Sequence, residues 1–234
     1  MSAPSLSHLK EAVLQANLAT VQHGLVIATF GNASGIDRDQ GRVVIKPSGV
    51  PYDGMTADAM VVTDLEGQVL DNRLRPSSDL GTHLALYRAF PGIGAVIHTH
   101  STFATIMAQA MAPIPCLGTT HADYFRGEIP VTRPLTPEEI AGDYVAATGA
   151  VIIETFADRD PLEVPAVLVA GHGPFVWGRT PDQAALNALI LEEVARMAWH
   201  ALMLRPDLPP IPAPLLDRHF LRKHGADATY GQPA

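Results

Sequence analysis

The feature that most constrains this chain is an apolar run, Ala95-Val96-Ile97, that ends in His98-Thr99-His100. The run predicts a buried strand, and residues two apart in a strand point to the same face. Two imidazoles placed in this way converge on one metal ion, and α/β enzymes commonly build their sites at strand ends. The alternative interpretation is that one histidine is buried in the strand and the other belongs to the loop.

A second apolar run, Val167 to Ala170, leads into Gly171-His172-Gly173 and offers a third imidazole. The flanking glycines allow a tight turn and a close approach to another element. Three neutral imidazoles with an open fourth position are typical of catalytic zinc, whereas structural zinc usually has four protein ligands, often cysteines. Cys116 is the one cysteine of the chain, so a structural zinc site is disfavoured. The expected ligands are His98, His100 and His172, and the expected ion is Zn²⁺, with Mn²⁺ or Co²⁺ as alternatives.

The composition of the chain limits the kinds of molecule that it is expected to bind. The 234 residues are 47% hydrophobic and 17% charged, which predicts one domain or two small ones with a sizeable core. A net charge of −8 argues against a nucleic-acid partner, although a few local donors still hold one phosphate. We find no apolar run of membrane-spanning length and no signal-peptide pattern. We therefore expect no membrane association and, given the single cysteine, a cytoplasmic location.

The spacing of apolar residues and the capping residues predict the secondary structure. Helices are expected over residues 4–22, from Leu80 to Pro91, over 103–110, from Thr136 towards Phe156, from Thr180 to about Leu204 and over 215–224. Strands are expected over 25–30, 42–46, 61–63 and 68–70, at 95–98, around 116–118, and from Pro165 to His172. The proline-rich stretch 205–214 predicts an extended arm. Glu192 and Glu193, in mid-helix, are interpreted as structural.

Three polar segments offer an anion pocket, and each also has an ordinary structural interpretation. Gly31-Asn32 either turns the chain or presents backbone N–H groups and an amide to an anion. Lys46, followed by Pro47-Ser48-Gly49, either contacts an oxyanion or ends an exposed hairpin. Ser77 and Ser78 precede a helix, where serine is a common N-cap but free N–H groups also bind phosphate.

Two further segments carry candidate catalytic groups. Asp79 suits the dipole of the helix that it opens, or it is a carboxylate facing the metal. The polar stretch Thr119 to Phe125 shows neither helical nor strand periodicity. It is either a hydrogen-bonded turn or a loop with acid–base groups. Neither Gly-x-Gly-x-x-Gly nor the P-loop pattern occurs in the sequence, which disfavours a nucleotide cofactor.

Together these segments resemble the class II aldolase/adducin-like family, and most closely its L-ribulose-5-phosphate 4-epimerase branch, over nearly the whole chain. The segments that carry the resemblance are 31–34, 46–50, 76–79, 98–100, 118–124, 172–174, 215–225 and 230–232. Aspartate at position 79 is similar to the epimerases, whereas fuculose-phosphate-type aldolases carry glutamate there. The adducin head has the fold without the histidine ligands, and this sequence has all three.

The resemblance implies a single α/β domain over residues 1–234, with a mostly antiparallel central sheet flanked by helices. It also implies a homotetramer with sites at subunit interfaces, where the C-terminal arm (about 205–234) packs. The implied metal ligands are His98, His100 and His172, with Asp79 beside the ion. The implied phosphate pocket consists of Asn32, Lys46, Ser48, Gly49, Ser77 and Ser78. The implied acid–base pair is Asp123 and Tyr230, on opposite faces of the substrate, with His219 nearby.

The implied reaction interconverts L-ribulose 5-phosphate and D-xylulose 5-phosphate, a step of carbohydrate metabolism that links arabinose catabolism to the pentose phosphates. The ketone is at carbon 2, so the hydrogen on carbon 4 is not acidic and simple proton abstraction cannot invert that centre. The remaining routes are transient oxidation by a nicotinamide, or breaking and remaking the bond between carbons 3 and 4. The sequence has no dinucleotide fingerprint. A three-histidine metal suits the second route, because a Lewis acid stabilises the enediolate left by retro-aldol cleavage.

Three alternatives stay open at this stage. A class II aldolase would use the same site and release both fragments of the sugar phosphate. A non-enzymatic scaffold of adducin type is disfavoured by the intact histidines. A metallohydrolase is disfavoured because the sequence has no His-Glu-x-x-His.

Overall fold

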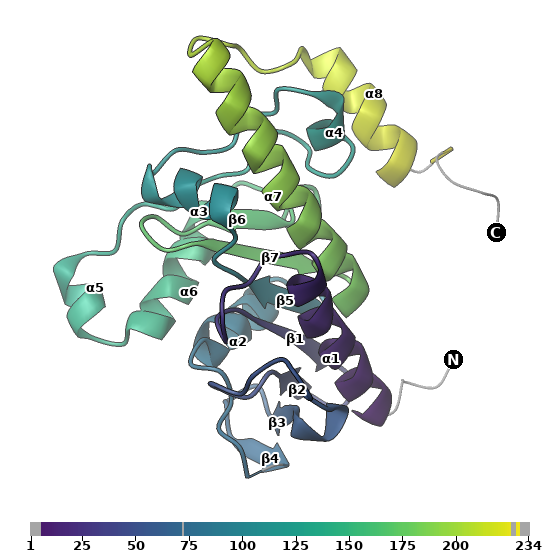
Figure 1. The fold of residues 1–234 in the computed structure, drawn as a ribbon, viewed down its shortest axis with the longest axis vertical. Coiled ribbons are helices and arrows are strands. Elements are labelled where there is room, and N and C mark those ends of the chain that lie inside the picture. Colours follow the sequence, from purple (N-terminus) through teal and green to yellow (C-terminus); the bar gives the residue numbers. More distant parts are fainter. Residues whose placement is uncertain (1–5, 72, 226–227, 230–234) are drawn as a thin grey trace.

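The computed structural model describes residues 6–71, 73–225 and 228–229, and within them seven strands form one sheet (Figure 1). The strand order is β4-β3-β2-β1-β5-β7-β6, and every neighbouring pair is antiparallel. The strands are β1 (Asn32–Asp37), β2 (Arg42–Ile45), β3 (Val61–Thr63), β4 (Val69–Asp71), β5 (Ala95–His98), β6 (Ala166–Leu168) and β7 (Pro174–Gly178). The expected α/β class with an antiparallel central sheet is confirmed.

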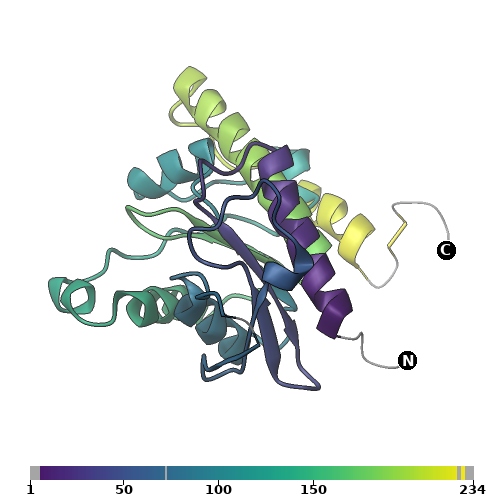
Figure 2. The same ribbon diagram turned by 60° about the horizontal axis from the view of Figure 1, so that its bottom comes forward.

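Helices cover both faces of this sheet. They are α1 (Leu6–Gln22), a 3₁₀ turn (Ala57–Ala59), α2 (Leu80–Ala89), α3 (Thr102–Gln109), α4 (Thr119–Ala122), α5 (Pro137–Ala141), α6 (Tyr144–Thr155), α7 (Pro181–Leu204) and α8 (Ala213–His224). Figure 2 shows α1 and α7 on one side of the sheet and α2 and α6 on the other. No helix in the described part of the chain has the length and apolar character needed to cross a membrane.

The strand expected over residues 25–30 is wrong, because residues 25–27 are irregular, residues 28 and 29 form a turn, and the strand starts at Asn32. Ile27 and Phe30 are exposed rather than packed, at 62% and 57%. Ala28 has a left-handed backbone with φ 53°, which a strand does not allow. The apolar character of this segment therefore does not reflect burial in the sheet.

The strand that takes this place, β1, consists mainly of small and polar residues but lies in the middle of the sheet between β2 and β5. Its small residues let α1 approach closely. A Cβ atom at Gly35 would lie 2.9 Å from side-chain atoms of Leu9 and of Val13. Close helix packing, rather than a run of apolar side chains, therefore defines this central strand.

Three other boundaries differ from the sequence predictions. The helix expected from Thr136 towards Phe156 is interrupted at Gly142, because Asp143 begins a second helix by accepting a hydrogen bond from the Ala146 N–H. The strand expected from Pro165 to His172 ends at Leu168, so His172 lies in the turn before β7. The stretch 116–118 forms no strand, and β7 was not expected.

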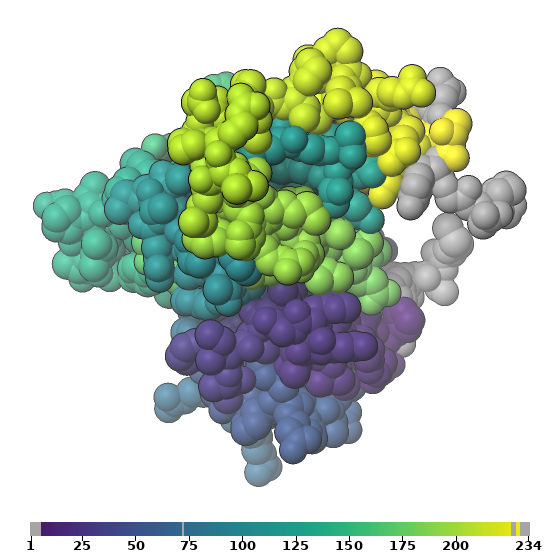
Figure 3. Space-filling model, turned by 45° about the horizontal axis from the view of Figure 1, so that its top comes forward, coloured from purple at the N-terminus to yellow at the C-terminus, as the bar shows by residue number. Residues whose placement is uncertain are grey.

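The extended arm over 205–212 and the helix that follows it agree with the sequence prediction. The arm is held by a hydrogen bond from the Ile211 N–H to the Cys116 carbonyl, at 2.9 Å. Helix α8 packs on α4, and Arg126 pairs with Asp217 across that contact at 3.1 Å. Figure 3 shows the C-terminal helix in yellow beside the teal segment that it covers.

Candidate metal centre and anion pocket

His98 is the last residue of β5 and is fixed on both sides by the sheet. It lies opposite Asn32 of β1 and Phe175 of β7, and its ring stacks on the Phe175 ring with centroids 4.3 Å apart. Its Nδ1 is 2.9 Å from the Pro174 carbonyl oxygen. Because a carbonyl only accepts, Nδ1 carries the proton and donates it, which leaves a lone pair on Nε2.

His172 is presented by the turn between β6 and β7, and both flanking glycines are required there. Gly171 has φ +70°, a left-handed conformation that favours glycine. A Cβ atom at Gly173 would lie 2.8 Å from the Thr99 carbonyl oxygen. This confirms that the glycines allow the tight turn and the close approach that the sequence predicted.

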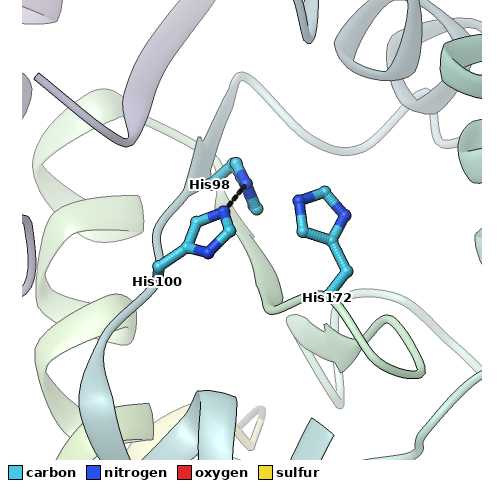
Figure 4. Close-up of side chains that lie close together, drawn as sticks. All are labelled: His98, His100 and His172. Atoms are coloured by element: carbon cyan, nitrogen blue, oxygen red, sulfur yellow. Dashed lines mark hydrogen bonds between the residues drawn. The ribbon is translucent and has the colours of Figure 1, made fainter. Parts of the chain in front are cut away.

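The three imidazoles converge, as Figure 4 shows. One ligand nitrogen from each of His98, His100 and His172 lies within 4.8 Å of the others, and the Nε2 atoms of His98 and His100 are 3.1 Å apart. Two nitrogens bound at about 2.0–2.1 Å to a tetrahedral ion lie about 3.3 Å apart, so the spacing fits one divalent ion. The donor set therefore suits the metal that the sequence led us to expect.

Burial keeps these imidazoles neutral. It lowers the pKa of His98 to about 3, and it also lowers the pKa of His100 and of His172, while the nearby Asp79 partly opposes each shift. Neutral imidazole is the form that binds a metal ion. At pH 7 all three side chains are therefore available as ligands without first losing a proton.

The same cluster forms one wall of a pocket of about 370 Å³. The pocket lining includes the residues proposed for phosphate and metal binding, namely Asn32, Lys46, Ser48, Gly49, Ser77, Ser78, Asp79, His98, His100 and His172. It also includes Gly31 and Pro47, which belong to the predicted segments, and Thr29 and Phe30, which sequence reasoning did not single out as site residues. Segments that are far apart in the sequence are thus brought to one place.

Backbone pairing joins the two serine-bearing segments of the pocket. Pro47 and Pro76 form an antiparallel bridge, the Ser77 N–H donates to the Lys46 carbonyl at 3.0 Å, and the Ser48 N–H donates to the Arg75 carbonyl at 2.9 Å. Gly49 has φ +68° in the turn that follows Ser48. The two predicted phosphate-binding segments are therefore held side by side.

The N-terminus of α2 opens towards this pocket. The N-cap residue is Asp79, not a serine, and its side chain makes no capping hydrogen bond. Its carboxylate instead accepts a hydrogen bond from the Asn32 amide, at 2.6 Å. Burial opposes ionisation of Asp79, but nearby imidazoles and the Asn32 bond outweigh it, so its pKa lies below the ordinary value. A carboxylate thus lies beside the three histidines.

Lys46 lies beneath the pocket and is 2% exposed. Its ammonium donates to the Val50 carbonyl at 3.0 Å and lies 4.6 Å from the centre of the Tyr52 ring. Burial lowers its pKa from the ordinary value. The interpretation of Lys46 as the exposed end of a hairpin is therefore wrong.

Asp123 and His219 are brought together, but away from this pocket. The Asp123 carboxylate accepts hydrogen bonds from His219 Nδ1 at 3.0 Å and from Arg222 at 2.8 Å. Burial raises the pKa of Asp123, and the bonds from Arg222 and His219 lower it more, so it lies below its ordinary value. Neither residue lines the pocket of the described chain. The other proposed acid–base residue, Tyr230, lies outside the described residues.

The amino-acid sequence of this chain is similar to those of known proteins. Residues 11–199 match the family model described as the class II aldolase and adducin N-terminal domain. The chain is 54% identical to the L-ribulose-5-phosphate 4-epimerase UlaF of Salmonella paratyphi A over 227 residues, which cover 97% of this chain and 100% of that relative. The corresponding UlaF of Salmonella typhi is similar to the same extent.

Solved structures are similar as well. An L-fuculose 1-phosphate aldolase matches 93% of this chain and 95% of its own with a TM-score of 0.77 and 24% identity, which supports the fold. YgbL of Klebsiella pneumoniae matches 92% of this chain and 99% of its own, with a TM-score of 0.74 and 26% identity.

Proposed function

Because the chain belongs to the class II aldolase and adducin family, we propose that it is an L-ribulose-5-phosphate 4-epimerase. It would interconvert L-ribulose 5-phosphate and D-xylulose 5-phosphate. The observation that carries this proposal is that the three-histidine cluster and the serine-lined N-terminus of α2 face the same pocket. The full-length similarity to UlaF selects the reaction among those of the family.

The phosphate of the substrate binds at the serine-rich side of the pocket. The N-terminus of α2 carries a partial positive charge, and Ser77 and Ser78 lie just before it. Ser48 and Gly49 supply a second set of donors, and Asn32 and Lys46 complete this wall. These groups hold a phosphate although the chain is acidic overall.

The carbon–carbon bond is broken at the histidine side of the pocket. His98, His100 and His172 would hold a divalent ion, which we take to be Zn²⁺ with Mn²⁺ or Co²⁺ as alternatives. This ion would supply a Lewis acid for the charge that develops on the dihydroxyacetone half. Asp79, ionised beside the cluster, orients that half and balances the charge of the site. The phosphate contacts keep the aldehyde half bound while it rotates.

Asp123 and Tyr230 act as the acid–base pair. One group accepts the proton of the carbon 4 hydroxyl, the bond between carbons 3 and 4 breaks, and its electron pair stays on the dihydroxyacetone half. After the aldehyde has turned its other face, that pair re-forms the bond and the second group protonates the new alkoxide. Asp123 is a carboxylate at neutral pH, as a group that accepts a proton must be, and the hydrogen bond from His219 fixes its position.

The separation of Asp123 from the pocket supports a site shared between subunits. We propose a homotetramer in which the end of α4 and the arm over 205–234 together bring Asp123, His219 and Tyr230 of one subunit to the metal of its neighbour. Enzymes that act on phosphorylated pentuloses work where those metabolites are made, so a cytoplasmic location is part of this proposal.

The experiment that tests this function is incubation of metal-loaded protein with L-ribulose 5-phosphate. The proposal expects D-xylulose 5-phosphate as the product without added nicotinamide, and little free glycolaldehyde phosphate. Accumulation of free aldehyde and dihydroxyacetone would instead identify a class II aldolase, which uses the same site and releases both fragments.

A further inference from the structure

The reaction described above does not use Tyr144, yet its hydroxyl oxygen lies 3.3 Å from Nδ1 of His172. His98 has a comparable partner at Nδ1, the Pro174 carbonyl at 2.9 Å. Metal-binding histidines almost always donate the N–H of their second nitrogen to an oxygen of this kind, which fixes the tautomer and the orientation of the ring. Tyr144 is in the place where such a partner of His172 would be found.

Only one direction of the hydrogen bond between Tyr144 and His172 leaves Nε2 of His172 able to bind a metal ion. If the phenol oxygen accepts the proton of Nδ1, the lone pair of His172 is on Nε2. Figure 4 shows the His172 ring turned with one nitrogen towards His98 and His100. If the phenol donated to Nδ1 instead, the proton of the neutral ring would lie on Nε2 and would block the ion. The arrangement that fits a metal is therefore the one in which Tyr144 accepts.

The backbone of Tyr144 is fixed although its side chain is 40% exposed. Tyr144 is the first residue of α6, directly after the N-cap Asp143, and its carbonyl accepts a hydrogen bond from the Thr148 hydroxyl at 2.8 Å. The next residue, Val145, accepts from the Thr82 hydroxyl of α2 at 2.9 Å. Helix α2 begins at the pocket. This hydrogen bond therefore links α6 to the helix whose N-terminus lines the pocket across from the histidines.

Close packing of the two helices also limits their movement. A Cβ atom at Gly149 of α6 would lie 2.7 Å from the Ala85 Cβ of α2. The backbone of Tyr144 is thus held in place relative to the pocket by the packing of α6 on α2.

We propose that Tyr144 is a positioning residue for the metal: it accepts the Nδ1 proton of His172 and so keeps Nε2 directed at the ion. This inference rests on the proposed metal site. It assigns Tyr144 no contact with the substrate and predicts an effect on metal affinity rather than on substrate binding.

The test compares Tyr144→Phe with the wild-type protein. The substitution keeps the ring and removes the hydroxyl, so the fold is retained. We expect the dissociation constant for Zn²⁺, measured by competition with a chromophoric chelator, to rise by about tenfold. In the metal-free protein, nitrogen-15 NMR of His172 should show a smaller fraction of the tautomer protonated at Nδ1. The matched control is Tyr87→Phe, a tyrosine whose hydroxyl bonds Ser34 and not a ligand histidine, which should leave both quantities unchanged.

A dissociation constant for Tyr144→Phe within twofold of the wild-type value, with an unchanged tautomer ratio, would overturn the role of Tyr144 while leaving the metal site intact. Failure of the wild-type protein to bind Zn²⁺ would overturn the metal site and this inference together. The two failures are therefore distinguished by the wild-type titration alone.

Discussion

At the scale of single residues, the candidate site depends on side chains whose charge state is set by their surroundings. Loss of solvent lowers the pKa of each histidine ligand and favours neutral imidazole, while the Asp79 carboxylate is stabilised by the hydrogen bond that it accepts from Asn32. These are the forms that a divalent metal requires, so the site is ready to bind an ion at neutral pH without proton release.

Replacement of a ligand should remove the metal without unfolding the chain. For His98→Asn we expect loss of most of the bound zinc, since two imidazoles hold the ion far less well than three. Asparagine can still donate to the Pro174 carbonyl, so the circular dichroism spectrum should be unchanged. Metal content is measured by elemental analysis after dialysis, with His23→Asn, an exposed histidine after α1, as the control. Undiminished zinc in His98→Asn would sink the ligand assignment.

The phosphate pocket predicts an effect on substrate affinity. Ser78→Ala removes one donor to a charged group, which is worth about 1.5–3 kcal/mol, so the KM for L-ribulose 5-phosphate should rise about tenfold or more. The rate with unphosphorylated L-ribulose should stay as it is in the wild-type protein. Equal activity of the wild-type protein on the two sugars would mean that the phosphate pocket is misplaced.

At the scale of elements, the sequence predicted those parts of the fold whose signals are local. The capping box at Thr136 and the N-cap Thr180 are present as expected. Glu192 is structural, as expected: from the middle of α7 its carboxylate accepts the N–H groups of Phe103 and Ala104 at the start of α3. Such capping from a distant helix could not be read from the sequence, because it depends on tertiary packing.

The wrong strand predictions arise where packing between elements, and not the local apolar pattern, decides which residues enter the sheet. Residues 25–30 are mostly apolar but form no strand, and the small, polar residues of β1 form a central strand because α1 packs closely on them. Strand β7 was detectable, since Phe175-Val176-Trp177 is an apolar run bounded by proline and glycine. The clustering of the histidines with the Ser-Ser-Asp and Lys-Pro-Ser-Gly segments was predictable because these motifs are specific. The contact of Tyr144 with His172 was not, because it depends on the packing of α6 on α2.

The docking of α8 predicts a pH dependence of stability. The pKa of Asp123 is lowered in the folded chain, so its ion pairs stabilise the fold above the unfolded pKa of about 3.9 and are lost as the pH falls through the lower, folded value. Asp123→Asn should therefore lower the urea midpoint at pH 7, and the difference from wild type should shrink below about pH 4. Asp207→Asn, an exposed aspartate of the arm, is the control. A difference that did not change with pH would contradict this role.

At the scale of the whole molecule, the proposed mechanism requires that the metal ligands of one subunit and Tyr230 of another meet at one site. Tyr230→Phe removes only the hydroxyl, and we expect it to lower epimerase turnover by about 10²–10⁴ with zinc content and tetramer size unchanged. Cleavage of one epimer should survive better than interconversion, because cleavage uses one face of the aldehyde. Near-normal turnover in this variant would show that the hydroxyl is not catalytic.

Mixing variants extends that prediction to the assembly. Tyr230→Phe chains co-assembled with His98→Asn chains should regain about a quarter of the wild-type turnover, because in a cyclic tetramer that fraction of shared sites combines an intact metal with an intact tyrosine. No recovery in mixed tetramers would place both groups in one subunit.

The most direct test of the central claim, inversion by cleavage and re-addition at the histidine site, supplies the two fragments instead of the sugar. Metal-loaded protein is incubated with dihydroxyacetone and glycolaldehyde phosphate, and the products are identified by NMR. We predict that both L-ribulose 5-phosphate and D-xylulose 5-phosphate form, and that neither forms with His98→Asn. Formation of no pentulose phosphate, by a preparation that still interconverts the two epimers, would contradict the mechanism.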